Sequence, residues 1–242
     1  AAQLAVIDIP TRDTTIRILL EWENDPQAIV ALFTGGKGVA GIRDDGKIAI
    51  ARGNFAVRTR KHLHSAGIAS AVVDRAADMP DDIRGQRGTI KHYEDIGAVV
   101  GFLRKRFGAP VWLHGTSRGS VSVANAASNL EQSATSPDGV IFSASMLKLA
   151  NQGNHVFDFY LDRIKMPVLI LHHRDDACSV TPASEVPRFA AELKAATRLK
   201  TIFYEGGHKP RSGPCAGRHA HGFFGIEKRV LGDLAKFVLG QI

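Results

Sequence analysis

Residues 110–119 read Pro-Val-Trp-Leu-His-Gly-Thr-Ser-Arg-Gly, an apolar run that stops at a serine with a glycine on either side. The apolar run is typical of a buried strand, and the small residues at 120–130 predict a helix directly after it. A Gly-x-Ser-x-Gly string between a strand and a helix indicates a nucleophile elbow, a sharp turn that exposes a serine hydroxyl above a sheet. We therefore expect Ser117 to be a nucleophile; the alternative is that it merely caps the helix.

Strand and helix patterns alternate on both sides of this turn. Strand patterns cover residues 4–9, 14–22, 28–33, 68–73, 110–114, 139–143, 166–172 and 199–204; helical spacing covers 55–66, 89–107, 120–130, 183–196 and 226–239. The first strands are typical of antiparallel neighbours, whereas the later ones are separated by the helices that parallel crossovers need. The pattern predicts an α/β fold with a mostly parallel eight-stranded sheet flanked by helices. We expect one domain over residues 1–242.

Composition excludes some classes of function. Hydrophobic residues make up 44% of the chain, and no apolar run approaches the roughly 18 residues that would indicate a membrane span. The net charge of +7 comes from basic residues spread along the sequence. Their one tight run, residues 104–106, ends a predicted helix, where cations complement the helix dipole. We therefore expect neither a nucleic-acid partner nor a membrane span.

From the second strand to the terminal helix, the chain resembles the α/β-hydrolase superfamily, both in the string 115–119 and in the order of its elements. In that superfamily a nucleophile, an acid and a histidine follow the fifth, seventh and eighth strands, and this chain has candidates at all three places. The resemblance implies a serine hydrolase that cleaves a small-molecule carboxylic ester without a metal or organic cofactor. Alternatives are a thioesterase, lactonase or peptidase with the same triad, or a non-catalytic binding protein.

Two neighbouring aspartates compete for the role of the acid. Residues 169–176 read Leu-Ile-Leu-His-His-Arg-Asp-Asp and resemble the family's seventh strand and the loop that follows it. The family's spacing favours Asp176 and leaves Asp175 as the alternative acid. At least one of the two must be a plain turn residue.

Three histidines follow the last predicted strand: His208, His219 and His221. The Gly-Gly-His string that ends at His208 resembles many family members, whereas the His-Gly-Phe string that begins at His221 resembles the dienelactone-hydrolase-like branch. Cys178 and Cys215 form one disulfide or remain two thiols; a disulfide would tether the loop that holds all three histidines beside the acid. On that argument we prefer His221 as the base, then His208, then His219.

Two backbone N–H groups are expected to form an oxyanion hole, one from Arg118 and one from Gly36. Residues 34–35, Thr-Gly, occupy the place of the family's His-Gly, so that Thr34 departs from the usual histidine. The segment 146–165 is too short for a large cap domain. A bonded cysteine pair would favour a periplasmic or secreted location over a cytoplasmic one. The histidine spacing matches no closed zinc pattern, so we expect no metal site.

Overall fold

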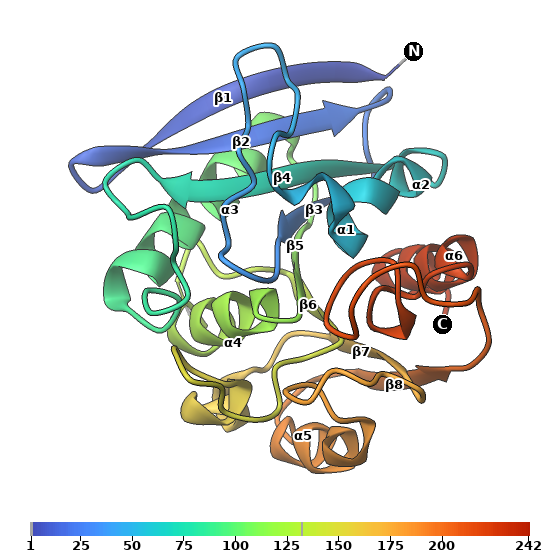
Figure 1. Ribbon diagram of the computed structural model, residues 1–242. Helices are drawn as coiled ribbons and strands as arrows, with labels where there is room; N and C mark the ends of the chain where they lie inside the picture. Colours follow the sequence, from blue (N-terminus) through green and yellow to red (C-terminus); the bar gives the residue numbers. More distant parts are fainter. Residues whose placement is uncertain (1, 132) are drawn as a thin grey trace.

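One eight-stranded sheet forms the centre of the computed structural model, which describes residues 2–131 and 133–242 (Figure 1). Ala1 and Gln132, which the predicted domain range of 1–242 includes, lie outside the described residues. The strand order is β1-β2-β4-β3-β5-β6-β7-β8. The strands are β1 (Gln3–Thr11), β2 (Thr14–Trp22), β3 (Ala28–Phe33), β4 (Ile68–Ala76), β5 (Val111–Thr116), β6 (Gly139–Ser143), β7 (Val168–His173) and β8 (Leu199–Tyr204).

The sheet is mostly parallel, which confirms the predicted fold class. Strand β2 pairs antiparallel with β1 and β4, and every pair from β4 through β8 in the sheet order is parallel. All residues of β3, β5, β6 and β7 are buried. Strands covered on both faces need apolar side chains on both faces, which explains their continuous rather than alternating hydrophobic runs.

Helices cover both faces of the sheet, and a separate apolar core lies under each layer (Figure 1). One layer contains α3 (Ile90–Phe107), α4 (Gly119–Asn129) and α5 (Val186–Glu192); the other contains α1 (Phe55–Thr59), α2 (Lys61–His64) and α6 (Glu227–Val238). The terminal helix α6 buries Val230, Leu234 and Phe237. This is the face that its apolar spacing predicts.

The predicted helix over residues 55–66 is divided in the structure into α1 and α2. Two side chains at the break bond to the preceding turn: Thr59 Oγ1 donates to Phe55 O at 2.6 Å and Arg60 Nη1 to Val57 O at 2.7 Å. Such bonds compete with the regular helical ladder. The predicted helix over 183–196 is also shorter, and α5 follows a 3₁₀ turn at Ala183–Glu185.

The site is positioned by the reversal of strand order between β3 and β5. In the sheet, β4 lies beyond β3 on one side and β6 lies beyond β5 on the other, so the chain builds the sheet in opposite directions from this pair. Ligands of open α/β sheets bind where the strand order reverses in this way, beyond the carboxyl ends of the strands. The connection 146–165 contains only two 3₁₀ helices, Val156–Asp158 and Leu161–Arg163, which is too little chain for a cap domain. Within the described residues, no helix is long and apolar enough to cross a membrane.

Candidate active site

Ser117 lies on a strained turn between β5 and α4. Its φ of +80° is in the left-handed region, which non-glycine residues rarely occupy. Ser117 N donates to Ser143 O at 3.1 Å, and Ser120 Oγ donates to Ser117 O at 2.5 Å. A Cβ on Gly115 would lie 2.3 Å from Gly119 O, and one on Gly119 would lie 2.1 Å from Phe33 O. Both glycines are therefore required by the close approach of backbone, which explains their spacing around the serine.

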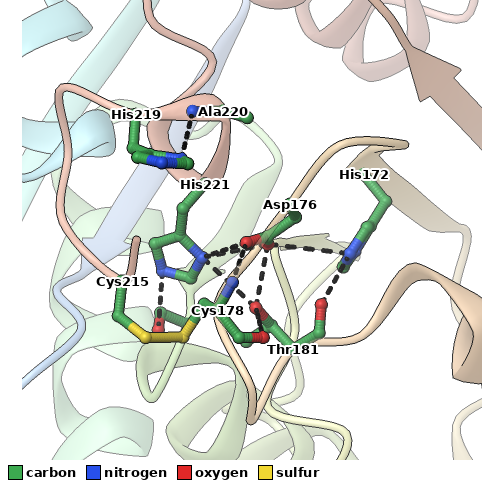
Figure 2. The surroundings of a disulfide bond; sticks show 9 residues. His172, Asp176, Cys178, Thr181, Cys215, His219, Ala220 and His221 are labelled. Carbon is green, nitrogen blue, oxygen red and sulfur yellow. Dashed lines mark hydrogen bonds and ion pairs between the residues drawn. A yellow bond between two sulfur atoms is a disulfide. The ribbon is translucent and has the colours of Figure 1, made fainter. Parts of the chain in front are cut away.

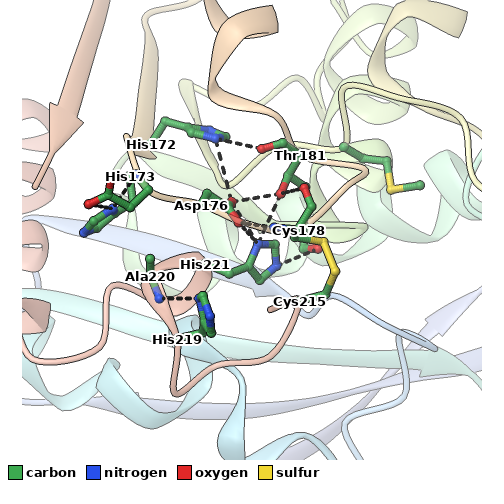
Figure 3. A network of polar contacts seen from close by, with 12 residues as sticks. His172, His173, Asp176, Cys178, Thr181, Cys215, His219, Ala220 and His221 are labelled. Carbon is green, nitrogen blue, oxygen red and sulfur yellow. Dashed lines mark hydrogen bonds and ion pairs between the residues drawn. A yellow bond between two sulfur atoms is a disulfide. The ribbon is translucent and has the colours of Figure 1, made fainter. Parts of the chain in front are cut away.

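A continuous series of hydrogen bonds leads from Ser117 to a buried carboxylate. His221 Nε2 lies 3.1 Å from Ser117 Oγ. On the other side of the ring, His221 Nδ1 lies 2.9 Å from Asp176 Oδ2, and Figure 3 shows these two side chains facing each other. Because the ionised carboxylate can only accept, the Nδ1 proton donates to Asp176 and Nε2 is left to accept the serine proton. The three side chains come from the ends of β5 and β7 and from the loop after β8.

Asp176 is held by more than the histidine. Its side chain is fully buried, and it also accepts bonds from Cys178 N at 3.0 Å and from Thr181 Oγ1 at 2.8 Å. Burial raises the pKa of Asp176, but the bonds from His221, Cys178 N and Thr181 outweigh that effect and leave its pKa below the ordinary value. The carboxylate is therefore ionised at neutral pH. Sequence reasoning missed Thr181, because no local pattern marks a hydroxyl five residues beyond the acid.

The other sequence candidates lie apart from this series. The Asp175 side chain is 77% exposed, and its one ion-pair partner among the described residues is His173, at 4.0 Å. His208 is exposed and contacts the ring of Phe224. His219 Nδ1 accepts from Ala220 N at 2.9 Å and so caps the short 3₁₀ turn that holds His221. The structure thus brings together Ser117, His221 and Asp176, and leaves Asp175, His208 and His219 outside.

A disulfide between Cys178 and Cys215 joins the loop of the acid to the loop of the histidine, with Cα atoms 4.7 Å apart (Figure 2). Of the alternatives open from the sequence, the structure has the bonded pair. The histidine loop is fixed on its other side by Arg58, whose guanidinium donates to Gly217 O and Gly222 O, each at 2.8 Å. These links hold His221 between the serine and the acid.

The glycine loop after β3 lies beside the nucleophile. A Cβ on Gly35 would lie 3.0 Å from Ser117 Cβ, and a cavity of about 60 Å³ is lined by Gly35, Gly36, Ser117 and His221 among others. Within the described residues, the N–H groups of Gly36 and Arg118 donate to no other group of the chain. Two unused donors beside a serine hydroxyl match the requirements of an oxyanion hole.

His172 and His173, at the end of β7, each lie within hydrogen-bond distance of a backbone carbonyl. His172 Nε2 lies 3.0 Å from Thr181 O, and His173 Nε2 lies 2.9 Å from Gly206 O. No cluster of three or more His, Cys, Asp or Glu side chains that could hold a metal ion is present in the described part of the chain.

Comparison with solved structures identifies the fold. An esterase from Pyrococcus furiosus superposes with a TM-score of 0.69 at 13% identity, over 98% of this chain and 90% of the esterase. A lidless α/β serine hydrolase from Xanthomonas campestris gives 0.63 at 13% identity, over 96% and 95% of the two chains. A dienelactone hydrolase from Anabaena variabilis also gives 0.63 at 13% identity, over 99% and 98%. No protein-family model and no curated protein matches the sequence. At this identity the likeness establishes the fold: the chain has the α/β-hydrolase fold.

Proposed function

We propose that this protein is a serine hydrolase of the dienelactone-hydrolase-like branch that cleaves carboxylic esters through an acyl-enzyme. The observation that carries the proposal is the hydrogen-bond series from Ser117 Oγ through His221 to Asp176, with distances of 3.1 and 2.9 Å. A nucleophile bonded to a base, which is itself oriented by a carboxylate, is the arrangement that activates a serine. The fold shared with esterases and serine hydrolases supports the same class.

Each residue has one role in the proposed reaction. Ser117 Oγ attacks the ester carbonyl while His221 Nε2 takes its proton, and the N–H groups of Gly36 and Arg118 bind the negative oxygen that forms. His221 then gives the proton to the departing alcohol. In the second half, His221 takes a proton from water, which attacks the acyl group, and returns that proton to Ser117 Oγ as the acid leaves. Asp176 keeps the Nδ1 proton in place throughout, and the chemistry needs no metal or organic cofactor.

A fluorophosphonate probe tests the proposal directly. We expect it to label the wild-type chain at Ser117, as shown by mass spectrometry of the modified peptide. The labelled enzyme should no longer hydrolyse a short-chain p-nitrophenyl ester. Thioester, lactone and peptide substrates in the same assay separate the alternative activities that the same triad serves. A folded wild-type protein that takes no label and turns over none of these substrates would favour the non-catalytic binding protein.

The two neighbouring aspartates provide a matched pair of variants. Asp176→Asn is expected to lower kcat by about 10³ to 10⁴-fold, because an amide N–H facing His221 Nδ1 favours the tautomer that cannot accept the serine proton. Asp175→Asn, one residue away and exposed, is expected to change kcat by less than about twofold. Steady-state kinetics with one activated ester decides between them. Equal losses in both variants would contradict the assignment of Asp176.

The disulfide supports a periplasmic or secreted location, because reducing conditions in the cytoplasm work against a persistent bond. We propose that the whole chain acts there as a single domain on a small-molecule ester. A cytoplasmic protein would instead be isolated with both thiols open to alkylation.

A further inference from the structure

Arg87 belongs to the segment that connects β4 to α3 in the sequence, and only 2% of its surface is exposed. Among the described residues, no carboxylate forms an ion pair with it. The charge of Asp82 raises the pKa of Arg87 slightly, but both oxygens of Asp82 already accept hydrogen bonds from Arg84. Burial, and to a lesser degree the charge of Arg118, lowers the pKa of Arg87 to about 9. The guanidinium is therefore a buried and unpaired cation at neutral pH, which is costly to fold around.

The partners of Arg87 are the carbonyls of the glycine loop. Arg87 Nη2 donates to Thr34 O at 2.7 Å and lies 3.4 Å from both Gly35 O and Gly36 O. A Cβ on Gly38 would lie 2.6 Å from the same nitrogen. Glycine at position 38 thus leaves the space that this side chain needs to reach three successive carbonyls.

A second set of contacts fixes the guanidinium and its backbone. Arg87 Nη1 donates to Ser122 Oγ at 2.7 Å, and Ser122 Oγ lies 2.8 Å from His92 Nε2. Burial lowers the pKa of His92 to about 3, so its ring is neutral. Because Ser122 Oγ already accepts from Arg87, we assign the Ser122 proton to the bond with His92 Nε2. Asn125 Nδ2 donates to Arg87 O at 2.9 Å. These partners come from α3 and α4, so the arginine connects the glycine loop to two rigid helices.

The geometry of the peptide unit relates these contacts to the nucleophile. The C=O and N–H of one trans peptide point in opposite directions, so the peptide whose oxygen, Gly35 O, faces Arg87 directs the Gly36 N–H away from it. Ser117 lies beside the same loop, with its Oγ 3.5 Å from a Cβ placed on Gly35. A cation bound to a carbonyl also polarises that peptide and makes its N–H a stronger donor.

We propose that Arg87 is the positioning residue of the oxyanion hole. It holds the carbonyl side of residues 34–36 so that the Gly36 N–H faces the oxygen that becomes negative when Ser117 attacks. The proposal rests on the proposed hydrolase function. The proposal also explains why threonine can stand at position 34, where the α/β-hydrolase superfamily usually has histidine. The glycine loop is held by Arg87, so it does not need a histidine side chain of its own.

Substitution of Arg87 tests this role by separating kcat from KM. Arg87→Met is expected to lower kcat for an activated ester by about 10²-fold with less than about a threefold change in KM, because an oxyanion donor acts mainly in the transition state. Arg87→Lys keeps the positive charge but lacks the planar guanidinium with its several fixed donors. Its kcat should therefore be about tenfold higher than that of Arg87→Met. The rate of fluorophosphonate labelling should fall in parallel with kcat.

Arg12→Met is the control for the loss of a structural arginine. Arg12 binds Asp78 and buried Asp95 near the turn between β1 and β2, so its loss should lower Tm and leave kcat within about twofold. All variants are assayed well below their measured Tm. If Arg87→Met does not fold, Ser122→Ala provides a second variant. It removes the bond to Arg87 Nη1 together with the Ser122–His92 bond, and it should lower kcat about threefold to tenfold at unchanged KM.

The outcomes distinguish this inference from the proposed function. Suppose that the wild type is active and that Arg87→Met, or both Arg87→Lys and Ser122→Ala, keep kcat within twofold of it. This result would overturn the role of Arg87 and leave the proposed hydrolase function intact. A folded wild type that neither hydrolyses esters nor takes the probe overturns the proposed function itself.

Discussion

Replacing Ser117 with alanine is expected to lower kcat for a p-nitrophenyl ester by about 10⁴-fold or more, because the acyl-enzyme can no longer form. The turnover that remains would come from the oxyanion hole and substrate binding alone. His221→Ala should lose a similar amount, and the double variant should lose little more than either, since the two side chains act as a unit. Steady-state kinetics on the three variants measures this directly.

Stability should hardly change in Ser117→Ala, because alanine carries the same backbone strain at φ +80° and the half-buried serine side chain contributes little to packing. Glycine adopts that conformation freely. Ser117→Gly is therefore expected to be as inactive as Ser117→Ala and more stable by about 1 kcal/mol. Thermal unfolding of both variants provides the measurement. Ester turnover in Ser117→Ala above one per cent of the wild-type rate would contradict the role of Ser117.

Local pattern was sufficient to predict the sharp turn at Ser117 between a strand and a helix, because the string 115–119 and its flanking elements are contiguous in sequence. The steric reason for Gly115 and Gly119 depends only on that turn and on β3, which lies next to β5. The parallel sheet could be predicted equally well, because long apolar runs that alternate with helical segments are compatible with few other folds.

The choice of the acid and the base that accompany Ser117 depends on contacts between residues far apart in sequence, which the sequence alone does not determine. Asp175 and Asp176 are neighbours, and only the fold exposes one and buries the other. Arg87 was missed altogether, because it lies in a polar segment that predicts a solvated loop, while its partners are more than 30 residues away in sequence. His92 and His114 are buried against Ser122 and Ser143, which are about 30 residues away in sequence, and no local pattern indicates these contacts.

These two histidines predict a marked loss of stability in mild acid. His92 and His114 are 4% and 0% exposed, and burial lowers the pKa of each to about 3. In the unfolded chain the same groups have a pKa of about 6.5. Above pH 6.5 both states hold these rings neutral, and the full stability is present. As the pH falls from 6.5 toward 3, the unfolded state takes up protons that the folded state does not, so stability is lost.

At pH 5, each ring should cost about 2 kcal/mol relative to pH 7.5, and the pair about 4 kcal/mol. Burial also lowers the pKa of His64 and His172, which adds to the loss. Carboxyl groups with lowered pKa, such as Asp176, contribute in the same direction only below about pH 4, where they take up protons in the unfolded state. The window from pH 7.5 to pH 5 therefore isolates the histidines. Urea unfolding at the two pH values gives the difference in unfolding free energy.

Substitution assigns the loss to particular rings. His92→Gln and His114→Gln are each expected to be less stable than wild type at pH 7.5, because a buried hydrogen bond to Ser122 or Ser143 is disturbed. Each should nevertheless lose about 2 kcal/mol less than wild type between pH 7.5 and pH 5, since one proton-binding group has been removed. His208→Gln, at an exposed position, is expected to keep the wild-type difference. A wild-type unfolding free energy that varied by less than 1 kcal/mol between the two pH values would contradict this prediction. The rings of His92 and His114 would then not be neutral and buried as in the structure. The assignment of His92 Nε2 as the acceptor of the Ser122 proton would fail as well.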